Sequence, residues 1–321
     1  MKTKLILCDG DSWTAGDVID PELKGDPNQP ANDQYRLPRV WPHKLGKLLN
    51  IDVVNKSVAG SSNDAIVRRI IPHTINLLKK YKPEEIFVII GWSSPERKDF
   101  YYKGEWESWE TLYPSQIDCF DNLPHGNEIK KFYKTYLRYY WNFEEYVSRF
   151  INQNLYLHYF FKNKNIDHLF FNAFYESSAK EFGNNIYLKF VEKGISGLLE
   201  NTDLLSEMND YQDKLARFIG AGKGSQAKRQ RLRQLKKGFA PTVVDTDDGY
   251  KVAISPILLE EFLKISAGIF KKESFRGFIM KDSKSKEGWK NNILLEKDYH
   301  PSEKSHELWA KELYKDLKDK I

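Results

Sequence analysis

Short runs of apolar residues alternate along the chain with longer segments in which apolar residues recur every three or four positions. The apolar runs predict β-strands, and the near absence of polar positions within most of them is typical of strands covered on both faces. These strand candidates are Leu5–Cys8, Ile51–Val54, Ile86–Ile90 and Leu169–Phe171. The helical patterns lie at about residues 41–49, 63–81, 127–163 and 303–317, and Pro72 is expected to kink or break the second of them. This alternation predicts a parallel sheet with helices on both sides.

Two stretches interrupt the alternation and define the expected domain organisation. Residues 98–126 are rich in aromatic side chains and loop-like, and residues 180–285 combine helical patterns with a run of basic residues. We therefore expect one core domain built from residues 1–179 and 286–321. Residues 98–126 form an aromatic loop insertion in this scheme, and residues 180–285 form an inserted helical and basic subdomain of unknown role.

The composition is that of a soluble globular protein. The chain has 321 residues, of which 40% are hydrophobic and 30% are charged, and no apolar stretch is long enough to cross a membrane. Too few apolar residues follow the amino-terminal lysines for a secretory signal, so synthesis in the cytoplasm is expected. The two cysteines, Cys8 and Cys119, do not make a disulfide framework, and no spacing of His, Cys or Asp suggests a metal site.

The formal charge of +5 is mild, but basic residues gather in residues 214–237, which hold nine Lys or Arg and no Asp or Glu. Such a run is most often a solvated helix face, and the alternative is a surface that docks an acidic partner or nucleic acid. No aromatic residue lies between positions 219 and 238, so stacking on single-stranded nucleic acid is not expected.

Turns rich in Gly and Ser follow the first three predicted strands. They are Asp9–Ser12, Ala59–Asn63 and Gly91–Ser94. In a parallel sheet the carboxyl ends of the strands lie along one edge, where ligands bind. The three turns therefore predict a site at that edge.

A serine on the first of these turns and a histidine near the far end of the chain indicate nucleophilic catalysis. The hydroxyl of Ser12 needs a base to take its proton, and His300 is the best candidate among seven histidines. Asp298 is placed to orient that imidazole and to stabilise its cationic form.

Acyl transfer also needs hydrogen-bond donors for the oxyanion that develops on the substrate. The backbone N–H groups of Ser12 and Gly60 are the first candidates. A third donor could come from one of three side chains on the other two turns, Asn63, Ser93 or Ser94. Arg97 is a candidate for binding a substrate anion, and the alternative is that it pairs with Glu96 or Asp99.

These motifs resemble the four blocks of the SGNH (GDSL-like) hydrolases. The resemblance is carried by Gly10-Asp11-Ser12, the Gly60 turn, the glycine turn after the third strand, and Asp298 with His300-Pro301, and it covers about residues 1–97, 165–175 and 290–321. It implies a flavodoxin-like three-layer α/β/α fold and activity as an esterase, a lipase or a carbohydrate O-deacetylase, without metal or cofactor. By the same resemblance, Ser12 is the nucleophile, His300 the base, Asp298 the acid and Gly60 an oxyanion donor.

The chain departs from the family pattern in two places. The third block normally reads Gly-x-Asn-Asp, and Ser93 stands where its asparagine would be. The family acid normally lies three residues before the histidine, where this chain has Lys297, so either Asp298 or Glu296 would take that role. The stretch Gly-Trp-Ser-Ser-Pro-Glu-Arg also resembles sequences of large tailed phages, which would imply association with a virion.

The expected function is therefore that of a serine esterase that hydrolyses a small acyl ester, such as an O-acetyl group on a carbohydrate. The expected partner is that acylated substrate, with no cofactor, nucleic acid or membrane, and the oligomeric state is left open. The alternative is a catalytically degenerate member of the fold that binds a ligand or serves as a virion structural protein.

Overall fold

The computed structural model describes residues 3–17, 19, 32–95, 97–103, 108–112, 126–139, 143–174, 256–271, 273–280 and 300–321. The chain forms two compact units. The first comprises Met1–Ser94, Leu155–Ser177 and Gly268–Ile321, and the second comprises Pro95–Asn154 and Ser178–Ala267.

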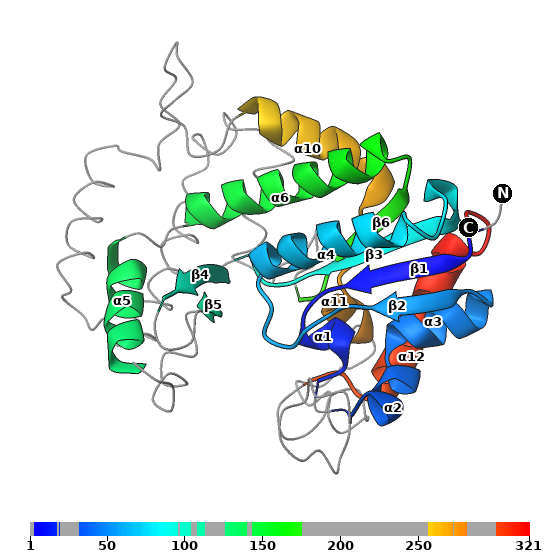
Figure 1. Ribbon diagram of the computed structural model, residues 1–321, viewed down its shortest axis with the longest axis horizontal. Helices are drawn as coiled ribbons and strands as arrows, with labels where there is room; N and C mark the ends of the chain where they lie inside the picture. The colour runs from blue at the N-terminus through cyan, green and yellow to red at the C-terminus, as the bar shows by residue number, and fades with distance from the viewer. Residues whose placement is uncertain are drawn as a thin grey trace. The chain divides into compact units, whose positions relative to one another are not determined.

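A four-stranded parallel sheet lies at the centre of the first unit (Figure 1). Its strands are β1 (Leu5–Asp9), β2 (Asp52–Asn55), β3 (Ile86–Trp92) and β6 (Asp167–Asn172), in the order β2-β1-β3-β6. Because β1 is central, Leu7 pairs with Val54 on one side and with Val88 on the other. A parallel bridge between Phe170 and Phe270 continues the order beyond β6. This is the flavodoxin-like order, so the predicted fold class is confirmed.

Helices cover both faces of this sheet and complete three layers. On one face α3 (Trp41–Leu49), α11 (Phe275–Met280) and α12 (Glu303–Leu317) pack on alternate strand residues to form the main core. Trp309 stacks on Phe275 with ring centroids 5.3 Å apart, and both are fully buried. Burial of each such side chain contributes roughly 1.5–3 kcal/mol to folding.

The opposite face carries α4 (Asn63–Leu77) and the part of α6 (Phe143–Asn163) that belongs to the first unit. Trp92 on β3 and Phe161 on α6 both contact the ring of Phe170, with centroids 5.6 and 6.5 Å away. The same alternation along β1 places Leu5, Leu7 and Asp9 on this face, whereas Ile6 and Cys8 belong to the main core.

The predicted strands are all present. Of the kink or break expected at Pro72, the break does not occur, because helix α4 continues through Pro72. Pro72 and Arg68 both face solvent, so water can bond the carbonyl that loses its partner. The helical region expected over 127–163 consists of two helices, α5 (Gly126–Tyr139) and α6. The other short helices described in the first unit are α1 (Ser12–Ala15), α2 (Asp33–Arg36), η2 (Leu37–Arg39) and η3 (Pro83–Glu85).

The second unit contains α5, the first part of α6, most of α10 (Pro256–Ile269) and an antiparallel hairpin. The hairpin, β4 (Lys98–Tyr102) paired with β5 (Ser108–Leu112), lies within the stretch that was expected to be an aromatic loop, and that expectation was wrong for these residues. Pairing with β5 makes these residues a strand, and the ring centroid of Phe100 lies 5.0 Å from those of both Phe132 and Tyr136 of α5. Residues 113–125 lie outside the described part of the chain.

The boundary of the expected 180–285 insertion also differs from the structure. Phe275 and Ile279 of α11 belong to the main core of the first unit. Residues 175–255, including the basic run at 214–237, lie outside the described residues. Within the described part of the chain, no helix combines the length and the apolar character that crossing a membrane requires.

Candidate active site at the carboxyl edge of the sheet

The first turn places Ser12 at the start of the one-turn helix α1 (Ser12–Ala15), directly after β1. Asp11 is the N-cap of this helix, since its Oδ1 accepts a 3.0 Å hydrogen bond from Trp13 N–H. Gly10 is required by packing, because a Cβ at that position would lie 2.4 Å from Thr14 Oγ1. Ser12 itself is only 5% exposed, so its hydroxyl lies in a largely desolvated turn.

The second turn presents Gly60 in the left-handed region, with φ +74°, a conformation that L side chains rarely adopt. A Cβ at Gly60 would meet no atom of the described residues within 4 Å. Among the described residues, none accepts a hydrogen bond from the N–H of Ser12 or from that of Gly60. Within the described part of the chain, both candidate oxyanion donors are thus left without an acceptor.

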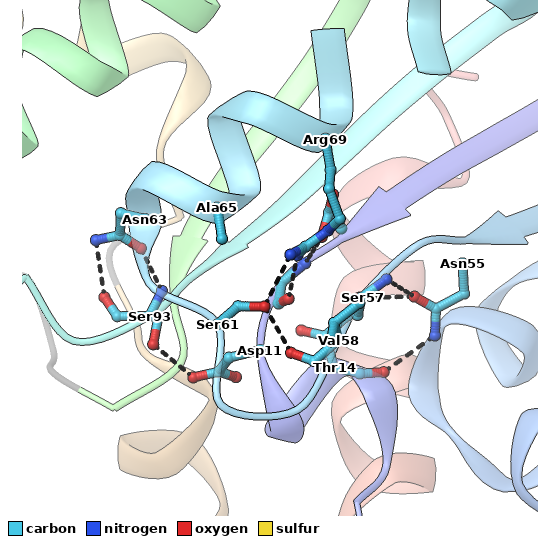
Figure 2. A network of polar contacts seen from close by, with 12 residues as sticks. Asp11, Thr14, Asn55, Ser57, Val58, Ser61, Asn63, Ala65, Arg69 and Ser93 are labelled. Atoms are coloured by element: carbon cyan, nitrogen blue, oxygen red, sulfur yellow. Dashed lines mark hydrogen bonds and ion pairs between the residues drawn. The ribbon is translucent and has the colours of Figure 1, made fainter. Parts of the chain in front are cut away.

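The third turn is fixed to the other two by side-chain hydrogen bonds (Figure 2). Asn63, the first residue of α4, bonds both backbone groups of Ser93: its Oδ1 accepts from the N–H at 2.8 Å and its Nδ2 donates to the carbonyl at 3.1 Å. The hydroxyl of Ser93 donates to Asp11 Oδ2 at 2.8 Å. Because a hydroxyl has one hydrogen, Ser93 as arranged here supports Asp11 rather than offering a donor to substrate.

This leaves the third oxyanion donor among the predicted side chains undecided. Asn63 is buried, and its Nδ2 carries a second hydrogen besides the one given to Ser93. Ser94 is also buried beside the same turn.

His300 reaches the first turn from the far end of the sequence. Its Nε2 lies 3.9 Å from Asp17 Oδ2, and the N–H of Asp17 donates a 3.0 Å hydrogen bond to the carbonyl of Ser12. Asp17 therefore lies near His300 through its side chain and contacts Ser12 through its backbone. No described residue hydrogen-bonds the Ser12 hydroxyl itself, so direct contact between Ser12 and His300 stays a prediction. Asp298, Glu296 and Lys297 lie outside the described residues.

A neighbouring histidine, His306, has a structural role. It is fully buried on α12, and its Nδ1 accepts a 3.2 Å hydrogen bond from Trp41 N–H at the start of α3. Burial, with smaller contributions from the charges of Lys44 and His300, lowers its pKa to about 3. His306 is therefore neutral near pH 7 and joins two helices of the main core.

Sequence reasoning missed one charged pair at the site, Asp9 and Arg69. Arg69 Nη2 lies 2.6 Å from Asp9 Oδ1, and the Asp9 side chain is fully buried. Burial raises the pKa of Asp9 to about 7, although the charge of Arg69 opposes this shift. The sequence could have indicated this pair through the position of Asp9, which shares one covered face of β1 with Leu5 and Leu7. A carboxylate buried on that face needs a cation in contact with it.

Arg97, the expected anion-binding residue, belongs to the second unit. There its carbonyl accepts a 3.0 Å hydrogen bond from Arg149 Nη2, which also donates to the carbonyl of Pro95. Glu96, one of its two alternative partners, lies outside the described residues. Within the described ranges, no group of three or more His, Cys, Asp or Glu side chains could hold a metal ion.

Comparison with models of protein families assigns the chain to one family. A model of DUF6071, a family of unknown function, matches residues 21–224. The chain belongs to the DUF6071 family. The match includes Gly60, Asn63, Arg69 and Ser93, whereas Ser12 and His300 lie outside the matched residues.

Comparisons with individual proteins add no argument about the function of this DUF6071 member. No curated protein matches it. Among solved structures it is similar to a putative lipolytic protein of the G-D-S-L family from Desulfitobacterium hafniense DCB-2, with 12% identity, a TM-score of 0.39, and 98% of this chain and 100% of that chain covered. It is also similar to a catalytic mutant of Axe2, an acetylxylan esterase from Geobacillus stearothermophilus, with 12% identity, a TM-score of 0.39, and 98% and 95% coverage. Scores this low do not establish a shared fold, so the fold assignment depends on the sheet order itself. Neither protein is described as phage-encoded, and the phage association stays a prediction.

Proposed function

We propose that the chain is a serine ester hydrolase with Ser12 as its nucleophile. One observation carries the proposal. The side chains of Asn63, Ser93 and Asp11 at these turns are engaged in one hydrogen-bond network, whereas no described residue uses the N–H groups of Ser12 and Gly60. Backbone donors in a folded protein are nearly always satisfied, and two donors that no described residue uses, one of them on the serine itself, suit an oxyanion.

The proposed reaction has two halves. His300 takes the proton of Ser12 as Oγ attacks the ester carbonyl, and the oxyanion is held by the N–H groups of Ser12 and Gly60. The intermediate collapses, and the leaving alkoxide takes the proton from His300, which leaves an acyl group on Ser12. His300 then deprotonates a water that attacks the acyl group, and returns that proton to Ser12 as the carboxylic acid departs. Asp298 orients the imidazole in this proposal.

The proposed substrate class is a small acyl ester, with O-acetyl groups on carbohydrate first among them. This part depends on the resemblance to SGNH hydrolases, whose members include carbohydrate O-deacetylases. Rates of hydrolysis of acetylated xylo-oligosaccharides and of p-nitrophenyl acetate, compared with each other, test this substrate class.

A fluorophosphonate probe tests the nucleophile without knowledge of the substrate. Wild type should form a covalent adduct at Ser12, located by peptide mass spectrometry, and Ser12→Ala should form none. Ser148→Ala, which alters a serine on α6 in the second unit, is the matched control and should label like wild type. An unlabelled wild-type protein would remove the hydrolase proposal and favour a ligand-binding or structural role on the same fold.

A further inference from the structure

The guanidinium of Arg69 binds groups on two different turns of the candidate site (Figure 2). Its Nη2 donates to Asp9 Oδ1 at 2.6 Å and to the carbonyl of Gly10 at 3.2 Å. Its Nη1 donates to Ser61 Oγ at 2.9 Å, and that hydroxyl donates to the carbonyl of Val58 at 2.7 Å. One rigid fork therefore joins the chain two residues before Ser12 to the chain next to Gly60.

The local sequence explains why an arginine reaches this place. Alternation along β1 turns Asp9 toward α4, and Arg69 lies on α4 between Ile66 and Ile70, which are buried against the sheet. Asp9 is fully buried, so an ion pair with good geometry is needed to hold its charge there. Asp9 Oδ1 also accepts a 2.7 Å bond from Gly10 N–H, so the carboxylate fixes the start of the serine turn as well.

A backbone hydrogen bond also links the two turns, but it is longer. Val58 N–H donates to the carbonyl of Gly10 at 3.3 Å, which is long for a backbone hydrogen bond. The planar fork of Arg69 fixes both direction and distance, which a lysine at the same position would not do.

We propose that Arg69 is a positioning residue that holds the Gly60 turn in register with the Ser12 turn, so that both N–H groups address one oxyanion. This inference rests on the proposed hydrolase function. Arg69 itself is not expected to touch the substrate, and its effect is carried through Gly10 and Ser61.

The test separates positioning from simple stability by using three variants. Arg69→Lys keeps the charge without the fork, Arg69→Met removes both, and Asp9→Asn with Arg69→Met removes the whole ion pair. Removing one partner leaves a buried charge uncompensated, whereas removing both is often tolerated. The double variant should therefore melt closer to wild type than Arg69→Met does. Arg68→Met, at an exposed neighbour on α4, is the matched control.

If Arg69 positions the donors, kcat on p-nitrophenyl acetate should fall at least about tenfold in Arg69→Lys, with KM changed less than about threefold. The double variant should keep this low kcat although its melting temperature recovers. Amide hydrogen exchange over Val58–Ser61 should be faster in all three variants and unchanged in Arg68→Met. Recovery of kcat together with stability in the double variant would overturn the positioning role.

The exchange measurement keeps this inference distinct from the proposed hydrolase. Suppose wild type is labelled at Ser12 but the three variants match its kcat and its exchange: only the role of Arg69 is then lost. If wild type is not labelled at Ser12, the hydrolase and the oxyanion role of Arg69 are overturned together, whatever the exchange shows.

Discussion

Replacement of Ser93 by alanine tests whether this hydroxyl supports the site or takes part in the reaction. The hydroxyl donates a 2.8 Å bond to Asp11 Oδ2, and Asp11 is fully buried. A hydrogen bond to a charged group contributes about 1.5–3 kcal/mol. The path of the chain should be kept in Ser93→Ala, because Asn63 bonds the backbone of residue 93 and not its side chain.

We therefore expect Ser93→Ala to lower the free energy of unfolding by about 2 kcal/mol. The assay is urea denaturation followed by tryptophan fluorescence. A double-mutant cycle with Asp11→Asn measures the charge-assisted part of this bond, since the amide oxygen can still cap α1 while the amide nitrogen can only donate to Ser93 Oγ. A coupling energy of at least about 1 kcal/mol is expected between the two positions.

The same variant decides between the two roles of Ser93 in catalysis. If the hydroxyl keeps its bond to Asp11 throughout the reaction, kcat should fall less than about tenfold at nearly constant KM. An oxyanion donor is worth about 10²–10³ in kcat. A loss of that size in Ser93→Ala, with little coupling to Asp11, would refute the supporting role and return Ser93 to the oxyanion site.

Two further predictions concern histidines. The pKa of His306 is about 3 in the folded protein, against an ordinary value of 6.5. Between these pH values the unfolded chain binds a proton at His306 and the folded chain does not. The free energy of unfolding is therefore highest above pH 6.5 and falls with the pH, by about 2 kcal/mol at pH 5. His306→Asn, whose Oδ1 can still accept from Trp41 N–H, should flatten this dependence in urea titrations at pH 5 and 7, and an unchanged slope would contradict it. Asp17 lies 3.9 Å from His300, a contact worth at most about 1 kcal/mol, so Asp17→Asn should lower kcat less than about fivefold. Asp298→Asn should lower kcat by about 100-fold or more, and the reverse order of effects would make Asp17 the orienting carboxylate.

The sequence predicts the parallel sheet well because each of its strands is marked locally by a run of apolar residues. Ile86–Ile90 is apolar throughout, and β3 is buried at every position in the structure. Alternation is a weaker signal where aromatic residues are dense. Lys98–Tyr102 reads as loop because aromatic and charged residues surround it, yet it forms β4 through pairing with a strand further along the chain. Such pairing is non-local, so the sequence immediately around one strand does not contain the information that predicts it.

Part of the candidate site could also be predicted from the sequence, because some of its residues are distinctive in their local context. Gly60 and Ser12 stand out by residue type at the ends of strands, and the structure gives each the backbone geometry that such a turn needs. The sequence does not predict which polar side chains hydrogen-bond one another and are therefore not free to bind substrate. Asn63 and Ser93 both looked like donors for substrate, and only the folded turn shows that Asn63 clamps the backbone of Ser93 while Ser93 bonds Asp11.

The Asp9–Arg69 pair shows how far the sequence pattern reaches. An aspartate at the end of an apolar run, two and four residues after Leu7 and Leu5, must lie under whatever covers that face of β1. A buried carboxylate needs a cation, and the covering helix offers a basic side chain beside its apolar stripe at Arg69-Ile70. The burial of a charge next to the serine turn thus links one strand to one helix. Asp9→Leu tests that argument directly: the leucine would fit the covered face but would leave Arg69 without its acceptor, so the variant should fold less stably than Asp9→Leu combined with Arg69→Met. Equal stability of the two in urea denaturation would show that Arg69 does not depend on this carboxylate.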